Sequence, residues 1–261
     1  MSENLEFDDE SSRLVEEFNA SAGAIERRRR ISAALALQAG ENVLDVGSGP
    51  GHQATEMATV IGATGSVVGI DPAESAISIS TQRCASLSNV HFQLGDVAEL
   101  PFEPRVFDAV MSSQVFEYLA DVPGALREIH RVLRPGARIL IHDTEWGALL
   151  WHTQNQNLTA KIMEVWDGHL ADPHLPQTLG AKLRDAGFVE IAVEPIVHVE
   201  NELAPGGMSD ILIKFVVGYA QSQGIPAAET EAWVEDLEGL SASGQYFFSS
   251  NEFIFTAKKP I

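Results

Sequence analysis

The stretch VLDVGSGPGHQA, residues 43–54, decides the fold of this chain. A short apolar run carries Asp45, and Gly47, Gly49 and Gly51 follow it at alternate positions. Glycines let the backbone turn tightly and let a ligand approach the main chain without meeting a Cβ. The stretch therefore predicts a strand, a ligand-binding turn and the start of a helix, whose free amides favour an anionic group of the ligand.

Outward from this turn, the sequence alternates between strand and helix patterns. Short β-branched runs at 42–46, 66–70, 89–94, 107–112 and 137–143 alternate with helical patterns at 53–61, 73–87 and 121–133. Such repeats build right-handed strand–helix–strand units, which place a mostly parallel sheet between helices on both faces. We therefore predict an α/β protein with a Rossmann-like fold.

The rest of the chain extends this core without a low-complexity linker. Apolar residues at helical spacing predict N-terminal helices and two later helical insertions, which we expect to form a lid. We expect a single domain over 1–261, with N-terminal helices at 1–40, a ligand-binding core at 41–144, lid insertions at 145–172 and 199–245, and a terminal strand at 246–261.

The composition narrows the classes of partner. The 17 basic and 37 acidic residues give a formal charge of −20, which repels polyanions because nucleic-acid affinity is built largely by neutralising phosphates. The single cysteine, Cys84, excludes an internal disulfide and a cysteine-rich metal site, and we expect no metal. No apolar run approaches the roughly 18 residues of a membrane span, and the acidic start lacks the blocks of a secretion signal. We expect a cytoplasmic protein with a small-molecule substrate and no nucleic-acid or membrane partner, and we leave a homodimer open.

Carboxylates stand at the ends of three successive predicted strands. Asp45 lies in the first strand, Asp71 ends the second before Pro72, and Asp96 follows the third beside Val97. They suit a ligand without phosphate that has an amino group, a ribose and an adenine. Asp96 would take the adenine amine, and the Val97 N–H would meet a ring nitrogen. Each aspartate has an alternative role as a helix cap or turn former, and the glycines with Asp71 alone would permit an NAD site.

Five motifs taken together resemble a known family. They read VLDVGSGPG, GID, GDVAELPF, FDAVMSSQVFEYL and ALREIHRVLRPGARILIHD, within residues 41–143. They are similar to the successive motifs of class I S-adenosylmethionine-dependent methyltransferases. The particular likeness is to the ubiquinone and menaquinone biosynthesis group, methyltransferase type 11.

The resemblance implies S-adenosylmethionine as cofactor and a seven-stranded sheet whose last strand runs antiparallel. It also implies that a methyl group passes to O, N, C or S of a small organic acceptor. His52 departs from the apolar or small residues that are common at its position in the family. The implied cofactor-binding residues are Asp45, Gly47, Ser48, Gly49, Gly51, Asp71, Pro72, Asp96, Val97, Ser113 and Gln114.

Methyl transfer from a sulfonium needs positioning and the exclusion of water, and it needs a base only where the acceptor carries a proton. His142, at the end of the fifth strand, and His152, at the root of the first insertion, are the candidate catalytic bases. Two alternatives stay open: an NAD-dependent oxidoreductase and a catalytically silent cofactor-binding protein. The G-S-G-P-G spacing and the Gly-Asp pair after the third strand favour methyl transfer over the oxidoreductase.

Overall fold

The computed structural model describes residues 16–261, and the part of the predicted N-terminal helices at 1–15 lies outside the described residues. A short helical segment at 16–20 precedes α2. The helices that follow are α2 (Ala22–Leu35), α3 (His52–Ile61), α4 (Glu74–Arg83), α5 (Val122–Val132), α6 (Gln156–Asp167), α7 (Leu175–Asp185), α8 (Met208–Ser222) and α9 (Ala227–Ala242), with 3₁₀ turns η1 (Phe116–Tyr118) and η2 (Trp146–Ala148). The strands are β1 (Asn42–Val46), β2 (Ser66–Asp71), β3 (Val90–Leu94), β4 (Phe107–Ser113), β5 (Leu133–Thr144), β6 (Leu150–Trp151), β7 (Val189–Glu200) and β8 (Phe248–Lys258).

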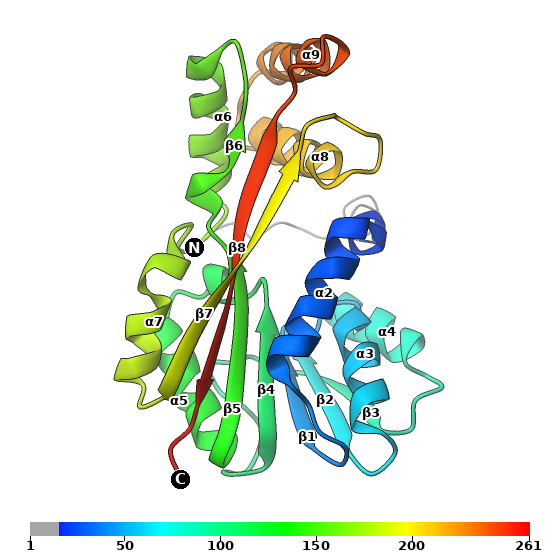
Figure 1. The fold of residues 1–261 in the computed structure, drawn as a ribbon, viewed down its shortest axis with the longest axis vertical. Coiled ribbons are helices and arrows are strands. Elements are labelled where there is room, and N and C mark those ends of the chain that lie inside the picture. The colour runs from blue at the N-terminus through cyan, green and yellow to red at the C-terminus, as the bar shows by residue number, and fades with distance from the viewer. Residues whose placement is uncertain (1–15) are drawn as a thin grey trace. The chain divides into compact units, whose positions relative to one another are not determined.

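The strands form one mixed, mostly parallel sheet. Their order is β3-β2-β1-β4-β5-β8-β6, and β7 also pairs with β8 (Figure 1). Strands β1 to β5 pair in parallel. Strand β8 runs antiparallel to β5. Lys259 N, just after β8, donates to Ala137 O near the start of β5, and Glu145 N, just after β5, donates to Asn251 O in the first part of β8. The Rossmann-like fold and the antiparallel last strand are therefore confirmed.

Within residues 16–261 the sheet has eight strands, and the predicted count of seven is wrong by one short strand. The additional strand is β6, in which Leu150 pairs with Ser249 and Trp151 with Phe248, antiparallel to β8. Two residues are too few to show the alternation by which a strand is recognised in a sequence.

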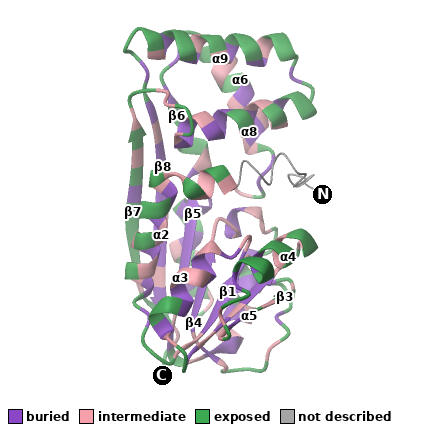
Figure 2. Cartoon of the chain, turned by 90° about the vertical axis from the view of Figure 1, so that its right-hand side faces the viewer, coloured by how far each residue is buried: buried purple, intermediate pink, exposed green. Residues whose placement is uncertain are grey.

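Helices cover both faces of the sheet, as the alternating pattern predicts. On one face, Leu44 and Val46 of β1 join a core cluster with apolar residues of α5 and α7. Successive side chains of a strand point to opposite faces, so Val43 and Asp45 face the other layer. Helices α2 and α3 lie on that other side of the sheet from α5 (Figures 1 and 2). Figure 2 shows β1, β4 and β5 as largely buried between the layers.

Local signals for helix ends act largely as predicted. Asp121 caps α5 by accepting a hydrogen bond from Gly124 N at 2.8 Å. Helix α4 ends at Arg83 rather than at residue 87, because the chain enters a turn in which Leu87 N donates to Cys84 O at 2.8 Å. The signals therefore place the helices correctly and misplace one end by about a turn.

The described residues divide into two compact units. The helical unit comprises the described residues up to Arg27 with Thr144–His174 and Ile196–Glu252, and the sheet unit comprises Arg28–Asp143, Leu175–Pro195 and Phe253–Ile261. The predicted N-terminal segment is divided between the two units at Arg27. That residues 1–261 act as a single domain stays a prediction.

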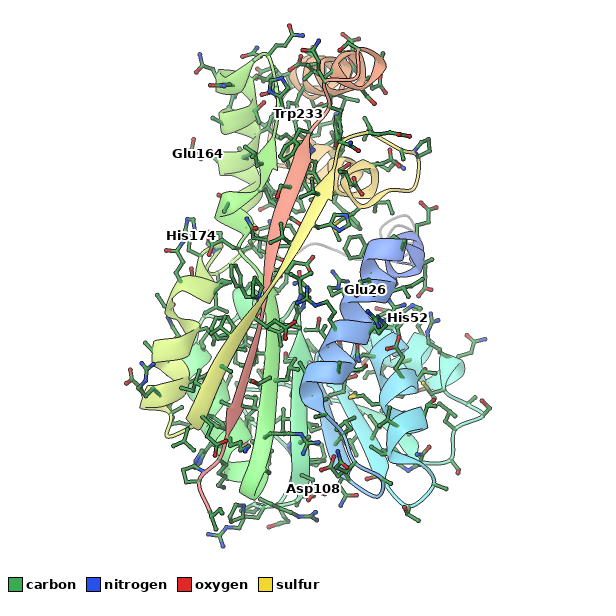
Figure 3. The ribbon with its side chains drawn as sticks, in the orientation of Figure 1. Glu26, His52, Asp108, Glu164, His174 and Trp233 are labelled. Carbon is green, nitrogen blue, oxygen red and sulfur yellow. The ribbon has the colours of Figure 1, made fainter. Side chains whose placement is uncertain are left out.

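The helical unit has its own apolar core. Trp151, Trp166 and Trp233 are buried in it among side chains of α6, α8 and α9, and Figure 3 labels Trp233. The rings of Trp151 and Trp233 meet edge to face with centroids 5.5 Å apart. Both predicted insertions thus form helices that pack on one another. Within residues 16–261, no helix is both long and apolar enough to cross a membrane.

Candidate functional site

The glycine turn lies between β1 and α3 and is anchored on the end of β2. The backbone amides of Gly47 and Ser48 both donate to Ile70 O at 2.9 Å. Gly47, Gly49 and Gly51 all have positive φ angles, of 68°, 49° and 82°. Side chains with a Cβ disfavour this conformation, so the three glycines set the path of the backbone.

Two of these glycines differ in what surrounds them. A Cβ on Gly47 would lie 2.2 Å from Cγ2 of Val115, whereas a Cβ on Gly49 would meet no atom within 4 Å. Gly47 is therefore required by close packing against the loop after β4. Gly49 leaves open space over the backbone, which a ligand can approach.

Asp45 places a carboxyl group in the interior next to this turn. Asp45 is 1% exposed, and its Oδ2 atom has no hydrogen-bond partner among the described residues. Burial, and next the charge of Asp71, raises the pKa of Asp45 to about 7. Because an unpartnered buried carboxylate is costly, a ligand cation that reaches it gains a strong charge-assisted hydrogen bond. This is the chemistry that an amino group would satisfy.

Asp71 joins the end of β2 to the glycine turn. Its Oδ2 accepts from Gly49 N at 3.0 Å, and its Oδ1 accepts from Ala73 N at 2.9 Å. Asp71 is half-buried, and Pro72 beside it is exposed. The structure therefore brings Asp45, Asp71 and the three glycines together, as the sequence predicts for the carboxyl end of parallel strands.

Asp96 and Val97 lie at the end of β3, the next strand of the sheet. The Asp96 side chain is exposed, and its Oδ1 accepts from Ala98 N at 2.8 Å. The Val97 side chain is buried in the core of the sheet unit. Asp96 thus has the turn-forming role that was its alternative, and contact of either residue with adenine stays a prediction.

Ser113, Gln114 and His142 meet at the ends of β4 and β5. Ser113 Oγ lies 3.0 Å from His142 Nδ1, and Gln114 N donates to His142 O at 2.8 Å. Gln114 has a positive φ of 57°, which is uncommon for a residue with a Cβ. His142 is fully buried, so its ring is held in place within the sheet unit.

His152 belongs to the helical unit, apart in the chain from the predicted cofactor residues. It follows β6, its side chain is exposed, and its backbone N–H donates to Phe247 O at 2.9 Å. His52 stands at the first position of α3, directly after Gly51 (Figure 3). A catalytic role of His142 or His152 stays a prediction. Among residues 16–261, no group of three or more His, Cys, Asp or Glu could hold a metal ion.

Sequence reasoning missed Val115, which contacts the turn at Gly47. A valine just after a strand carries no signal of its own. Its contact depends on the packing of the loop after β4 against β1, and no periodic pattern reports that.

Comparisons with known proteins point to one family. The chain is 27% identical over 226 residues to an uncharacterized 37.1 kDa protein in transposon TN4556 of Streptomyces fradiae, covering 86% of this chain and 64% of that protein. It is 34% identical over 117 residues to a demethylmenaquinone methyltransferase of Staphylococcus aureus, covering 45% of this chain and 48% of that one. Each match spans less than two thirds of the relative's length.

Solved structures share the fold. Phosphoethanolamine N-methyltransferase 2 of Haemonchus contortus, in complex with S-adenosyl-L-methionine, superposes with a TM-score of 0.65 at 19% identity, over 98% of this chain and 58% of that chain. The [4+2]-cyclase SpnF superposes with a TM-score of 0.57 at 22% identity, over 91% of this chain and 81% of that chain. At these identities the likeness establishes the fold alone.

A family model described as a methyltransferase domain matches residues 37–187, which is more than half of the chain. That match supports the predicted methyltransferase over the NAD-dependent alternative. The protein therefore belongs to the methyltransferase-domain family, and the resemblance to class I S-adenosylmethionine-dependent methyltransferases is confirmed.

Proposed function

We propose that this protein transfers a methyl group from S-adenosylmethionine to O, N, C or S of a small organic acceptor. The observation that carries the proposal is the buried Oδ2 of Asp45, which has no partner among the described residues. It lies next to a turn in which Gly49 leaves open space over the backbone. A cofactor with an amino group and no phosphate suits both features.

The proposed cofactor-binding residues all lie in the sheet unit. Asp45 would bind the cofactor's amino group, and the turn would support its methionine part. Asp71, with Pro72 beside it, would bind the ribose, while Asp96 and Val97 N–H would bind the adenine. The full proposed set is Asp45, Gly47, Ser48, Gly49, Gly51, Asp71, Pro72, Asp96, Val97, Ser113 and Gln114.

S-adenosylmethionine supplies, when bound, a methyl group that its sulfonium has already activated. The protein's own task is to hold an acceptor lone pair in line with that methyl and to keep water out. Positioning of this kind can lower a barrier by about 7–11 kcal/mol. A base is needed only for an acceptor that is protonated at the working pH, and His142 and His152 are the proposed bases.

The proposed acceptor is a small molecule rather than a nucleic acid. The formal charge of −20 opposes the approach of a polyanion. We propose the cytoplasm as the place of action, and a homodimer as one form of the protein.

Isothermal titration of the purified protein with S-adenosylhomocysteine, and in parallel with NADH, tests the cofactor. We expect S-adenosylhomocysteine to bind and NADH not to bind, and Asp45→Ala to weaken the binding. NADH binding without S-adenosylhomocysteine binding would overturn the proposal.

Turnover with a panel of phenols, amines, thiols and carbon acids then tests the transfer. Formation of S-adenosylhomocysteine with one class of acceptor supports methyl transfer. Cofactor binding without turnover of any acceptor would leave a cofactor-binding protein that is catalytically silent.

A further inference from the structure

Asp143 is a buried carboxyl group that the proposed function does not use. It lies near the end of β5, directly after His142, and is 0% exposed. Its Oδ1 accepts a hydrogen bond from Val115 N at 3.0 Å. One side chain of β5 therefore holds the loop after β4 through the backbone amide of Val115.

That loop contacts the glycine turn through one side chain. Val115 lies so close to Gly47 that an added Cβ there would approach Val115 Cγ2 to 2.2 Å. Asp143 thus contacts Val115 by its backbone, and Val115 contacts Gly47 by its side chain. The three residues form a continuous path within the sheet unit, from the end of β5 to the turn after β1.

The loop begins in a conformation that needs outside support. Gln114 precedes Val115 and has a φ of +57°, which costs a residue with a Cβ energy that its surroundings must supply. The Gln114 N–H donates to His142 O at 2.8 Å, and the next N–H, that of Val115, donates to Asp143 Oδ1 at 3.0 Å. Without Asp143, the loop would lose the hydrogen bond that holds the Val115 backbone, and with it support for the contact between Val115 and Gly47.

We propose that Asp143 is a positioning residue of the cofactor site, which acts through Val115 to fix the glycine turn at Gly47. This inference rests on the proposed function, because it assigns a cofactor to that turn. Asp143 touches neither the cofactor nor the acceptor in this proposal. Its contribution is to keep the turn in the conformation that the cofactor meets.

The ionisation of Asp143 suggests a conservative substitute. Burial raises the pKa of Asp143 well above its usual range, although the hydrogen bond from Val115 acts in the opposite direction. A substitute should therefore keep the size of the side chain and one accepting oxygen for the Val115 N–H. Asparagine has this shape, whereas alanine removes the acceptor and leaves the Val115 amide without its partner.

The test measures S-adenosylhomocysteine affinity by calorimetry, well below each variant's melting temperature. We expect Asp143→Ala to raise the Kd about tenfold, the loss that accompanies hydrogen bonds of this kind. Asp143→Asn should stay close to the unsubstituted protein. Asp108→Ala is the matched control, because Asp108 Oδ2 also accepts a hydrogen bond from a backbone N–H, that of Asn42 at 2.9 Å. This pair lies at the amino ends of β4 and β1, whereas the glycine turn follows the carboxyl end of β1. Asp108→Ala should lower stability and leave the Kd unchanged.

A double-mutant cycle tests the path itself. Val115→Ala keeps the backbone N–H and removes the contact with Gly47, so it should raise the Kd alone and remain testable if Asp143→Ala fails to fold. If Asp143 acts through Val115, the double variant should bind no more weakly than the weaker single variant. Additive losses, or an unchanged Kd in either folded single variant, would overturn the inference. Failure of the unsubstituted protein to bind S-adenosylhomocysteine would instead overturn the proposed function.

Discussion

The carboxylate of Asp71 accepts a hydrogen bond from the backbone amide of Gly49 at 3.0 Å. Its other oxygen accepts from Ala73 N at 2.9 Å. A carboxylate has about four acceptor positions, so these two hydrogen bonds leave capacity for the hydroxyls of a ribose. The group proposed to bind the ribose therefore also holds the glycine turn in place.

Asp71→Ala should weaken S-adenosylhomocysteine binding by roughly 1–3 kcal/mol, because hydrogen bonds to a charged group are lost together with the support of Gly49. Asp71→Asn keeps one accepting oxygen, so its affinity for S-adenosylhomocysteine should lie between those of Asp71→Ala and the unsubstituted protein. Titration calorimetry at one pH compares the three proteins. Equal affinity in all of them would show that Asp71 is misassigned.

The binding of S-adenosylhomocysteine should strengthen as the pH rises through about 7. Burial first, and the charge of Asp71 second, raises the pKa of Asp45 to about 7. An ammonium group binds the ionised carboxylate best, so affinity should follow its ionisation. Titrations between pH 5.5 and 8 measure this change in affinity, because they extend about one pH unit or more to either side of the Asp45 pKa.

Asp45→Asn is the control for that pH dependence. It should bind more weakly and lose the rise in affinity near pH 7, since the amide does not titrate. The raised pKa of Asp45 also makes the stability of the ligand-free protein depend on pH. Its contribution to the free energy of unfolding is fully present below the ordinary pKa of 3.8 and is lost as the pH rises through about 7. A pH profile that is unchanged in Asp45→Asn would assign the titration to another group.

Glu200→Gln should destabilise the helical unit and change its acid sensitivity. The two carboxylate oxygens of Glu200 accept from Met208 N at 2.9 Å and Ser209 N at 3.0 Å, at the start of α8. Burial would raise the pKa of Glu200, but the hydrogen bonds, including one from His198, outweigh burial and lower the pKa to about 2.

Because the folded-state pKa of Glu200 lies below the ordinary value of 4.5, its stabilisation is present above pH 4.5 and is lost as the pH falls toward 2. Urea unfolding at pH 7 and pH 3 should show a larger gap between Glu200→Gln and the unsubstituted protein at pH 7. Glu202→Gln, at a nearby exposed position, is the control and should leave stability unchanged at both values.

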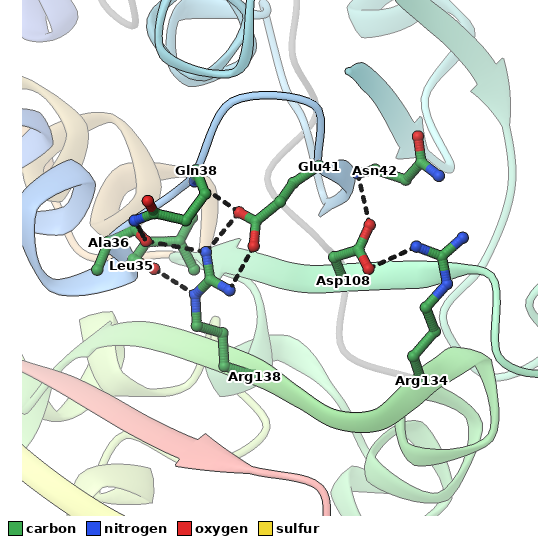
Figure 4. A network of polar contacts seen from close by, with 8 residues as sticks. All are labelled: Leu35, Ala36, Gln38, Glu41, Asn42, Asp108, Arg134 and Arg138. Carbon is green, nitrogen blue, oxygen red and sulfur yellow. Dashed lines mark hydrogen bonds and ion pairs between the residues drawn. The ribbon is translucent and has the colours of Figure 1, made fainter. Parts of the chain in front are cut away.

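Arg138→Met should lower the free energy of unfolding by about 1–3 kcal/mol, the scale for hydrogen bonds to charged groups. The Arg138 guanidinium donates to Glu41 at 2.6 and 2.9 Å and to the carbonyls of Leu35 and Ala36 at the end of α2 (Figure 4). Arg127→Met is the control, because the Arg127 side chain is 68% exposed and lies 3.8 Å from Asp121. If both variants unfold at the same urea concentration, the Arg138 network contributes no measurable stability.

His142→Asn and His152→Ala should separate the two proposed bases. The residue that removes the acceptor's proton should, when replaced, lower kcat by about 100-fold or more. The other variant should keep a kcat close to that of the unsubstituted protein. An acceptor that is already unprotonated at the assay pH should be insensitive to both substitutions, and a loss with that acceptor would indicate a structural effect.

The sequence by itself determined the sheet, the glycine turn and the meeting of Asp45 with Asp71. These depend on patterns within short stretches, together with the rule that parallel strands end at a common edge. Asp121 is a further example, since a helix cap acts on an amide three residues away. The family resemblance then supplied the cofactor that suits these groups.

Only the tertiary structure decided which distant groups approach one another. Three features involve segments that are separate in the sequence: the close approach of Val115 to Gly47, the burial of Asp45 Oδ2 without a partner among the described residues, and the hydrogen bond from Val115 N to Asp143. Strand β6 forms because β8 offers it an antiparallel partner. Such contacts are set by packing in three dimensions, and the periodicity of a single segment carries no record of them.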